Sequence, residues 1–307
     1  MGYKLITSGV CIAMSFTLLH GIKNQSPIDE RKKVQDDVAE IPLCYWEDKP
    51  LNFGDQLSPV LVRRLVGYDI RVTPRKKSIK GERQVLCIGS IIRFAFTGDI
   101  IWGSGVSGKS LNPKDYNFED LDVRAVRGPL TRDFLRKHFD IDVPEIYGDP
   151  ALLFPYLFPE FKKKKRPKRK FIVIPHYRDI KYFPRELYSY VVFPTEPWQK
   201  IIEAILDSEF VISGSLHGII IAEAYGIPAR WLRINDEEHM FKYVDYYLAT
   251  GRLYFRPAFS IDEALELGGE PPFICNLEKL YRAFPFELWP NGNYRDLDFT
   301  QSLEEVV

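Results

Sequence analysis

Short apolar runs alternate with amphipathic segments along the chain from residue 41 onward. In the first half, the runs that predict β-strands cover 41–46, the surroundings of Ile70, 85–88, 100–102 and 123–126. Helical patterns extend from about Asp55 to Val66 and start again at Pro129. Alternation of this kind predicts an α/β fold, with a parallel sheet covered by helices on both faces.

The same alternation begins again in the second half. Its predicted strands cover 171–174, 191–193, 210–213 and 229–232. One predicted helix is capped by Thr195, has Pro197 in its first turn, and carries a core-facing stripe of Trp198, Ile201, Ile202 and Ile205. A short apolar helix follows over 218–225. The chain therefore predicts two similar α/β halves.

Composition marks the boundary between these halves. Eight of the ten residues in FKKKKRPKRK, at 161–170, are Lys or Arg, which is typical of a solvated linker. The predicted parts are an N-terminal extension over 1–40, a domain over 41–160, the basic linker over 161–170, and a domain over 171–307 that ends in a helix. A nucleic-acid-binding patch is the alternative for the basic run, but no aromatic residues are interleaved with it, so no nucleic-acid partner is expected.

The N-terminal extension contains an apolar stretch over 5–22 that is broken by several polar residues. It predicts either a membrane anchor or a soluble amphipathic segment. Residues 23–37 are polar and indicate a linker. Membrane association through the N-terminus is therefore one of two open alternatives.

Charge and cysteine content exclude several classes of protein. Lys plus Arg equals Asp plus Glu at 42 each, so no overall field attracts nucleic acid or an acidic membrane. The cysteines stand far apart, at Cys11, Cys44, Cys87 and Cys275. Without a CxxC or Cys/His cluster, they argue against a structural zinc site and a disulfide framework. We expect buried free thiols in a reducing compartment.

Small and polar residues follow the predicted strands, where ligands bind in α/β folds. In the first half these junctions are NFGD at 52–55, WGSG at 102–105, RGP at 127–129 and YGDP at 147–150. Asp55 is placed to cap a helix, and the turn at Gly103 and Ser104 exposes backbone N–H groups. Arg127 stands at a helix start and predicts an anion site, with an ion pair as the alternative. Neither a GxGxxG nor a P-loop motif is present.

Two junctions of the second half contain histidine. PHYRD at 175–179 brings His176, Arg178 and Asp179 together, and SGSLHG at 213–218 places His217 between a strand and an apolar helix. A helix N-terminus and desolvation both favour loss of the imidazole proton, which suits acid–base chemistry near neutral pH. A core histidine without a catalytic role is the alternative for His217.

These junctions belong to motifs that occur in a recognisable order. They are NFGDQLSP, Ile-Gly-Ser at 88–90, IWGSG, VRGPLTR, YGDPALL, IPHYRD and SGSLHGIIIAEAYGIP. From about Tyr45 to Tyr247 the chain resembles the polysaccharide pyruvyl transferase family, above all its bacterial exopolysaccharide ketal-forming members. The resemblance implies two Rossmann-like domains facing across a cleft, as in GT-B glycosyltransferases. It also implies phosphoenolpyruvate as donor, a pyruvate ketal on a sugar as product, and no cofactor or metal.

The resemblance assigns roles to several residues. Donor contacts are expected from Arg127, His217, Ser215, Arg178, Gly103 and Ser104. Many members have arginine where this chain has Ser215, so another cation must compensate, and Arg178 is the candidate. The catalytic residues are expected to be His217 as general acid, with Asp149 or Asp55 dividing the acid and base tasks with it. Acceptor contacts are expected from Asn52, Asp55 and His176.

Two other functions remain open from the sequence. A GT-B glycosyltransferase would use a nucleotide sugar and an acidic residue such as Glu223 or Asp236 to bind the ribose. A sugar-binding or assembly protein without activity would be consistent with Ser215. The saccharide acceptor could be lipid-linked, and the enzyme either cytoplasmic, at the inner membrane face, or a type II membrane protein with a luminal catalytic domain. Aromatic residues near the C-terminus, Tyr281, Phe284, Phe286 and Trp289, predict a core helix or an acceptor platform.

Overall fold

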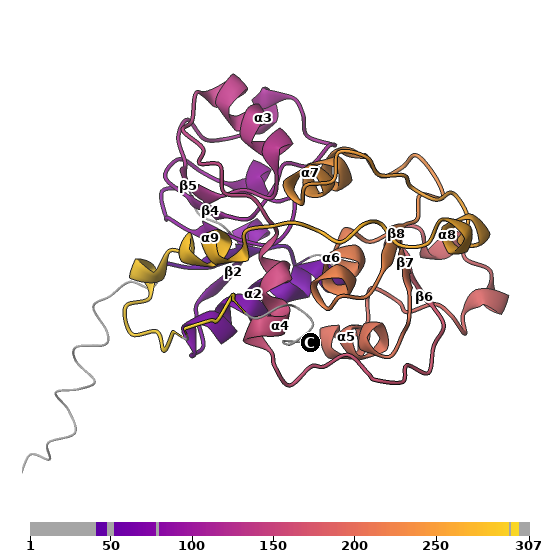
Figure 1. Ribbon diagram of the computed structural model, residues 1–307. Helices are drawn as coiled ribbons and strands as arrows, with labels where there is room; N and C mark the ends of the chain where they lie inside the picture. The colour runs from indigo at the N-terminus through magenta and orange to yellow at the C-terminus, as the bar shows by residue number, and fades with distance from the viewer. Residues whose placement is uncertain (1–40, 48–51, 78–79, 295, 301–307) are drawn as a thin grey trace, which may run out of the picture. The chain divides into compact units, whose positions relative to one another are not determined.

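Two parallel sheets organise the chain (Figure 1). The computed structural model describes residues 41–47, 52–77, 80–294 and 296–300. The predictions for the extension over 1–40, including the stretch 5–22 and Cys11, lie outside these residues. Within the described ranges, no helix is both long and apolar enough to cross a membrane.

The first sheet has five strands in the order β2-β1-β3-β4-β5, and the second has three in the order β6-β7-β8. Their bounds are β1 Leu43–Tyr45, β2 Val72–Pro74, β3 Val85–Leu86, β4 Ile100–Trp102, β5 Asp122–Ala125, β6 Ile172–Ile174, β7 Val211–Ser213 and β8 Ala229–Trp231. Every pair of neighbouring strands is parallel. The prediction of an α/β fold with parallel sheets is therefore confirmed.

Helices and short 3₁₀ turns connect the strands. The helices are α2 Phe53–Val66, α3 Pro129–Phe139, α4 Phe154–Leu157, α5 Trp198–Leu206, α6 Leu216–Ala224, α7 Phe241–Ala249, α8 Ile261–Leu267 and α9 Leu277–Arg282. The 3₁₀ turns are Arg75–Lys77, Ile92–Phe94, Pro113–Asp115, Pro150–Leu153, Ile180–Tyr182, Arg185–Leu187 and Phe286–Leu288.

Two local predictions before α5 differ from the structure. The segment expected as a strand over 191–193 makes only an isolated bridge between Val191 and Val173. Pro194 follows it directly and has no N–H group to extend the pairing. The helix expected after a Thr195 cap begins at Trp198, with Pro197 in the N-cap position.

Both faces of each sheet are covered by apolar side chains. Along β1, Leu43 enters one core cluster and Cys44 another, as expected because successive strand residues point to opposite faces. In the second sheet, Ile172 belongs to the same cluster as Leu43, whereas Val173 belongs to a third. One large apolar cluster is therefore shared by the two sheets.

The C-terminal segment belongs to this shared cluster. Phe284 and Trp289 are 2% and 0% exposed, and Phe284 packs edge-on against Trp102 of β4 at 4.8 Å between ring centroids. The Trp102 indole N–H donates to the carbonyl of Leu280 in α9 at 2.8 Å. Of the two alternatives for these aromatic residues, the structure places Phe284 and Trp289 in the core.

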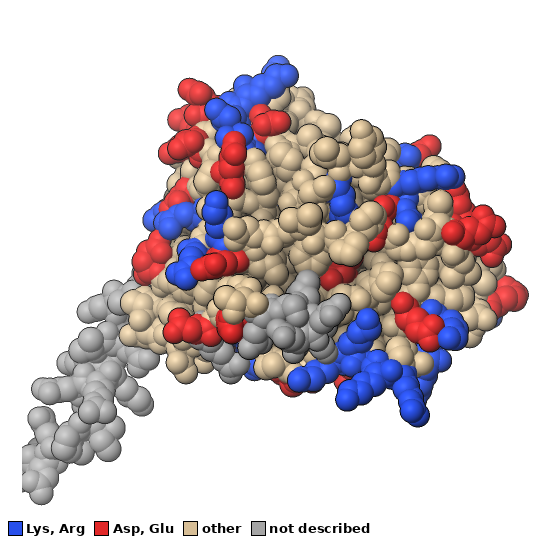
Figure 2. Space-filling view, in the orientation of Figure 1, with Lys and Arg blue, Asp and Glu red and all other residues tan. Residues whose placement is uncertain are grey.

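The basic run at 161–170 connects α4 to β6. Its Lys and Arg side chains are exposed. Figure 2 shows Lys and Arg gathered at the lower edge of the molecule, where this run passes beneath α5. Exposure agrees with a solvated connection, and the division of the chain into domains on its two sides stays a prediction.

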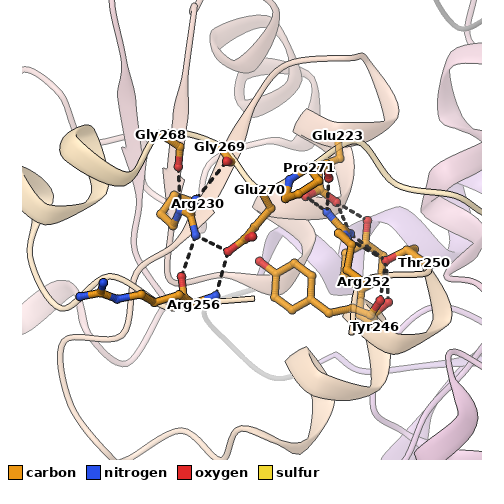
Figure 3. Close-up of polar contacts among 11 residues, drawn as sticks. Glu223, Arg230, Tyr246, Thr250, Arg252, Arg256, Gly268, Gly269, Glu270 and Pro271 are labelled. Carbon is orange, nitrogen blue, oxygen red and sulfur yellow. Dashed lines mark hydrogen bonds and ion pairs between the residues drawn. The ribbon is translucent and has the colours of Figure 1, made fainter. Parts of the chain in front are cut away.

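Buried charges of the second half are paired (Figure 3). Arg252 binds both carboxylate oxygens of Glu223 in α6, at 2.5 and 2.9 Å, and the Tyr246 hydroxyl donates to the same carboxylate at 2.6 Å. Nearby, Arg230 of β8 pairs with Glu270 and donates to the backbone carbonyls of Gly268 and Gly269. These contacts attach α6 and β8 to the segments that follow them.

We expect Glu223→Gln to lower the free energy of unfolding by about 3–5 kcal/mol, because it leaves the buried Arg252 without its counter-charge. Chemical denaturation measures this. Glu263→Gln is the matched control, because Glu263 pairs with Arg256, whose side chain is 65% exposed. That substitution is expected to cost less than about 1 kcal/mol. Equal losses in the two variants would contradict the role given to Glu223.

Candidate active site

A cavity of about 160 Å³ lies where the carboxyl ends of both sheets meet. Residues that follow β1, β3 and β4 line it from the first sheet, and residues that follow β6, β7 and β8 line it from the second. The predicted site residues that line it are Asn52, Asp55, His176, Arg178, Ser215 and His217. Because these residues all follow the carboxyl ends of strands, the fold brings together residues as far apart in the sequence as Asn52 and His217, which are separated by 165 positions.

The other predicted site residues, Arg127, Asp149, Gly103 and Ser104, are buried and do not line the cavity. A side chain at Gly103 would meet Pro150 at 2.3 Å, and the φ of Gly103 is +81°, so glycine is needed there for backbone reasons. The Ser104 hydroxyl donates to the carbonyl of Gly89 at 2.9 Å. Ser104 therefore supports the cavity wall at Gly89, which lines the cavity.

His217 lies in the first turn of α6 and is positioned by Gly54 of α2. A Cβ at Gly54 would stand 2.0 Å from the imidazole Nδ1, so the ring can occupy this place only beside a glycine. Nε2 faces Asp149 Oδ2 at 3.5 Å, which is within ion-pair range but too long for a good hydrogen bond. Both atoms are buried and lack a hydrogen-bond partner among the described residues. The imidazole and the carboxylate therefore face each other without a direct hydrogen bond between them.

Asp149 is held by its own turn. Its Oδ1 accepts a hydrogen bond from the Ala151 N–H at 3.0 Å and so caps the 3₁₀ turn at Pro150–Leu153. Only Oδ2 is directed at His217. The turn thus fixes a carboxylate behind the imidazole, where it can compensate the charge of an imidazolium.

Arg127 forms a buried ion pair across the chain. Its guanidinium contacts Asp245 of α7 at 3.0 Å, and the side chains are 1% and 0% exposed. Asp245 also accepts hydrogen bonds from the N–H and hydroxyl of Thr131 at 3.0 and 2.7 Å. Arg127 reaches the cavity through a hydrogen bond to the hydroxyl of Ser90 at 2.7 Å, and Ser90 lines the cavity. Much of the VRGPLTR motif thus serves to bind α7.

His176 is buried on the second-sheet side of the cavity. Burial, helped by the positive charge of Lys242, lowers the pKa of His176 to about 3, although the Glu238 carboxylate opposes this. The imidazole is therefore neutral near pH 7. Its Nδ1 has no hydrogen-bond partner in the described part of the chain, so it can take part in binding a ligand.

Three charged residues of the cavity escaped prediction from the sequence. Lys109, on the loop after β4, and Lys242, in α7, donate to the Glu238 carboxylate at 2.7 and 2.8 Å. Burial alone would raise the pKa of Glu238, but Lys242 and His176 hold it at about 2. Burial lowers the pKa of Lys242. The sequence did contain one signal for this ion pair, because Glu238 and Lys242 are four residues apart after the last predicted strand.

Arg178 is exposed, as Lys109 is, and its guanidinium donates to the hydroxyl of Tyr177 at 2.8 Å. Altogether, Lys109, Arg178 and Lys242 give the cavity cations from both halves of the chain. Among the described residues, no group of three or more His, Cys, Asp or Glu could hold a metal ion. No disulfide joins the cysteines in the described ranges. The arrangement is suited to binding an anion beside an acid–base histidine.

The chain belongs to the polysaccharide pyruvyl transferase family, whose family model matches residues 52–236. The uncharacterized protein L143 of Acanthamoeba polyphaga mimivirus is 28% identical over 224 residues, covering 69% of this chain and 75% of that protein. The succinoglycan biosynthesis protein ExoV of Rhizobium meliloti (strain 1021) is 28% identical over 222 residues, covering 68% of this chain and 65% of that protein. The latter match spans just under two thirds of the bacterial protein.

A crystal structure of an uncharacterized protein from Klebsiella pneumoniae subsp. pneumoniae NTUH-K2044 aligns with a TM-score of 0.44 and 14% identity, over 74% of this chain and 96% of that one. This likeness is too low to bear on the fold. The family match confirms what the ordered motifs predicted, both the family and an enzyme of the pyruvyl transferase class.

We expect Asp245→Asn to lower the free energy of unfolding by about 3–5 kcal/mol, because Arg127 would remain buried without a counter-charge. Denaturant titration measures the loss. Asp236→Asn is the matched control, since Asp236 is 89% exposed in its pair with Arg233 and should contribute less than about 1 kcal/mol. A loss below about 1 kcal/mol in Asp245→Asn would show that the buried pair does not hold α7.

His176 should make the protein less stable in acid. The folded state resists protonation of His176 down to a pKa of about 3, whereas in the unfolded chain its pKa is near 6.5. Below pH 6.5 the unfolded state therefore binds the extra proton, and stability falls by up to about 1.4 kcal/mol per pH unit. Comparing His176→Gln with the wild type between pH 7 and pH 4 isolates this contribution. Parallel pH profiles of the two proteins would contradict it.

Proposed function

We propose that this enzyme transfers the pyruvyl group of phosphoenolpyruvate to two hydroxyls of a saccharide and forms a pyruvate ketal. Membership of the polysaccharide pyruvyl transferase family supports the reaction class. The name of the bacterial relative, a succinoglycan biosynthesis protein, supports a polysaccharide or its precursor as acceptor. The observation that carries the proposal is the meeting of cations and the His217–Asp149 pair at one cavity.

The donor suits the charges of the cavity. Phosphoenolpyruvate carries a carboxylate and a phosphate, which need fixed cations for binding. Lys109, Lys242 and Arg178 provide them, and Ser90 and Ser215 provide hydroxyl groups. Arg127, which was expected to touch the donor, acts through Ser90 in this proposal because its guanidinium is bound by Asp245. Gly103 and Ser104 likewise support the donor site from behind.

His217 acts as the general acid. Its imidazolium protonates the methylene carbon of the donor and produces an oxocarbenium-like centre, which a sugar hydroxyl attacks. Asp149 keeps the positive charge compensated before the transfer. Asp55, which accepts a hydrogen bond from the Asn52 amide at 3.3 Å, receives the hydroxyl proton and returns it to His217. The C–O bond to phosphate then breaks, the second hydroxyl closes the ketal, and its proton leaves with the phosphate.

The acceptor binds beside the donor at Asn52, Asp55 and His176. All three line the cavity, and the neutral His176 can donate or accept a hydrogen bond from a sugar hydroxyl. The two halves of the chain then work as Rossmann-like domains facing across a cleft, since the ends of both sheets contribute to the cavity. A phosphoenolpyruvate supply favours a cytoplasmic enzyme, and the acceptor can be lipid-linked.

The alternatives have less support. A glycosyltransferase needs an acidic residue free to bind a ribose, but Glu223 is bound by Arg252 and Asp236 by Arg233, and neither lines the cavity. A protein without activity was suggested by Ser215 alone. The cavity compensates the charge that serine does not supply, because Lys109 and Lys242 lie there as well.

We expect His217→Gln to lower kcat for acceptor-dependent phosphate release from phosphoenolpyruvate by about 10²–10⁴-fold, because the general acid is removed. Galactosyl, glucosyl and mannosyl acceptors are to be compared. His138→Gln is the control, since His138 is exposed on α3 and should leave the rate unchanged. Near-normal turnover by His217→Gln would exclude His217 as the acid. Binding of nucleotide sugars without binding of phosphoenolpyruvate would favour the glycosyltransferase.

A further inference from the structure

We propose that the carboxylate of Glu238 occupies the position of an anionic group of the donor, and that Lys109 and Lys242 bind this group once Glu238 withdraws. The identity of the donor rests on the function proposed above, but the anion site itself rests on the contacts described below. The chemical class of the ligand group is a phosphate or carboxylate. Glu238 is in this view a built-in competitor of the donor.

The contacts place an anion between two cations inside the cavity. Glu238 Oε2 accepts from Lys109 Nζ at 2.7 Å and lies 3.7 Å from His176 Nε2, while Oε1 accepts from Lys242 Nζ at 2.8 Å. Lys109, Lys242, His176 and Glu238 all line the cavity. A phosphate or carboxylate of the donor offers the same arrangement of acceptor oxygens as this side chain.

The buried charge of Lys242 explains why an anion is needed beside it, whether from Glu238 or from a ligand. The Lys242 side chain is only 16% exposed, and a mostly buried ammonium group without a counter-charge is costly. With Glu238 in place, two of the cavity cations, Lys109 and Lys242, are already neutralised. A multiply charged donor can use them only if Glu238 leaves, because two anions in one position repel each other.

The two sides of this contact differ in how firmly they are held. Lys242 is part of α7, where Asp245 is bound by Arg127 and the Tyr243 ring stacks on Trp231 at 4.1 Å between ring centroids. Glu238 lies in the irregular segment between β8 and α7, which forms bends over 235–238. A displaced carboxylate can follow this segment while Lys242 stays in place. Glu238 is therefore the part that moves.

Glu238→Gln gives the decisive test, because the proposal predicts a gain of affinity. We expect the Kd of phosphoenolpyruvate and of inorganic phosphate, measured by calorimetry on the full chain, to fall by about tenfold, which is about 1.4 kcal/mol, because the competing charge is gone. Lys242→Gln should raise the same constants by at least about tenfold. Glu237→Gln is the matched control, because Glu237 binds the exposed Lys181 and Tyr182 instead and should leave both constants unchanged.

Other roles for Glu238 give different results. A purely structural ion pair predicts that Glu238→Gln lowers the melting temperature without tightening binding, and a catalytic base predicts a lower kcat at unchanged Kd. Either result overturns the proposal. Glu238→Asp serves if the glutamine variant does not fold, since its carboxylate is too short to reach both lysines and should also tighten binding. The proposal also fails if no folded variant at Glu238 binds phosphoenolpyruvate or phosphate more tightly than the wild type. It fails likewise if neither the wild type nor any variant binds these ligands.

The test separates this proposal from the proposed function. If the wild type binds phosphate but not phosphoenolpyruvate, the assigned donor is wrong. A tighter phosphate complex of Glu238→Gln would then still support the anion site. If phosphoenolpyruvate binds and is turned over but Glu238→Gln binds it no better, the function stands and the competing role of Glu238 fails.

Discussion

The buried ion pair between Arg127 and Asp245 is the contact on which the geometry of the cavity depends. It joins the end of the first sheet to α7, and both side chains are almost completely buried. Since α7 also carries Lys242, the pair fixes where a cation from the second half stands relative to Ser90 and Lys109 of the first. A buried pair contributes little net stability but is costly to break from one side, so it acts mainly to select one arrangement.

Local sequence patterns predicted the parts of this site but not their mutual contacts. Strands such as β4 and β7 were recognisable because parallel strands buried on both faces are continuously apolar. His217, Asp55 and His176 were found because they follow such strands. The partner of Arg127 was not predicted, because Asp245 lies 118 residues away along the chain and nothing in its helix marks it as a partner. The pairing is a property of the folded chain and of the close approach that Gly128 permits.

The charged residues around Lys242 also could not be assigned to the site from the sequence alone. The segment from Asn235 to Lys242 offers several acidic side chains at similar spacing, and only the fold decides that Glu238 enters the cavity while Asp236 and Glu237 face solvent. The segment before α5 also differed from its prediction. Pro194 has no N–H to continue the pairing of Val191. The helix begins at Trp198, with Pro197 and not Thr195 at its N-cap.

The buried ion pairs around Glu223 and the two histidines of the cavity differ in how far their polar atoms are satisfied. Around Glu223 and Arg230 each buried charge meets its counter-charge and several hydrogen-bond partners. In the two histidines that line the cavity, Nε2 of His217 and Nδ1 of His176 are buried and lack such partners among the described residues, and so does Oδ2 of Asp149 behind His217. Each unmet group costs about 1–3 kcal/mol of stability. In the proposed function, a donor or acceptor group that hydrogen-bonds to His217 or His176 recovers part of this cost on binding, so the same unmet hydrogen-bonding capacity that weakens the fold contributes to affinity.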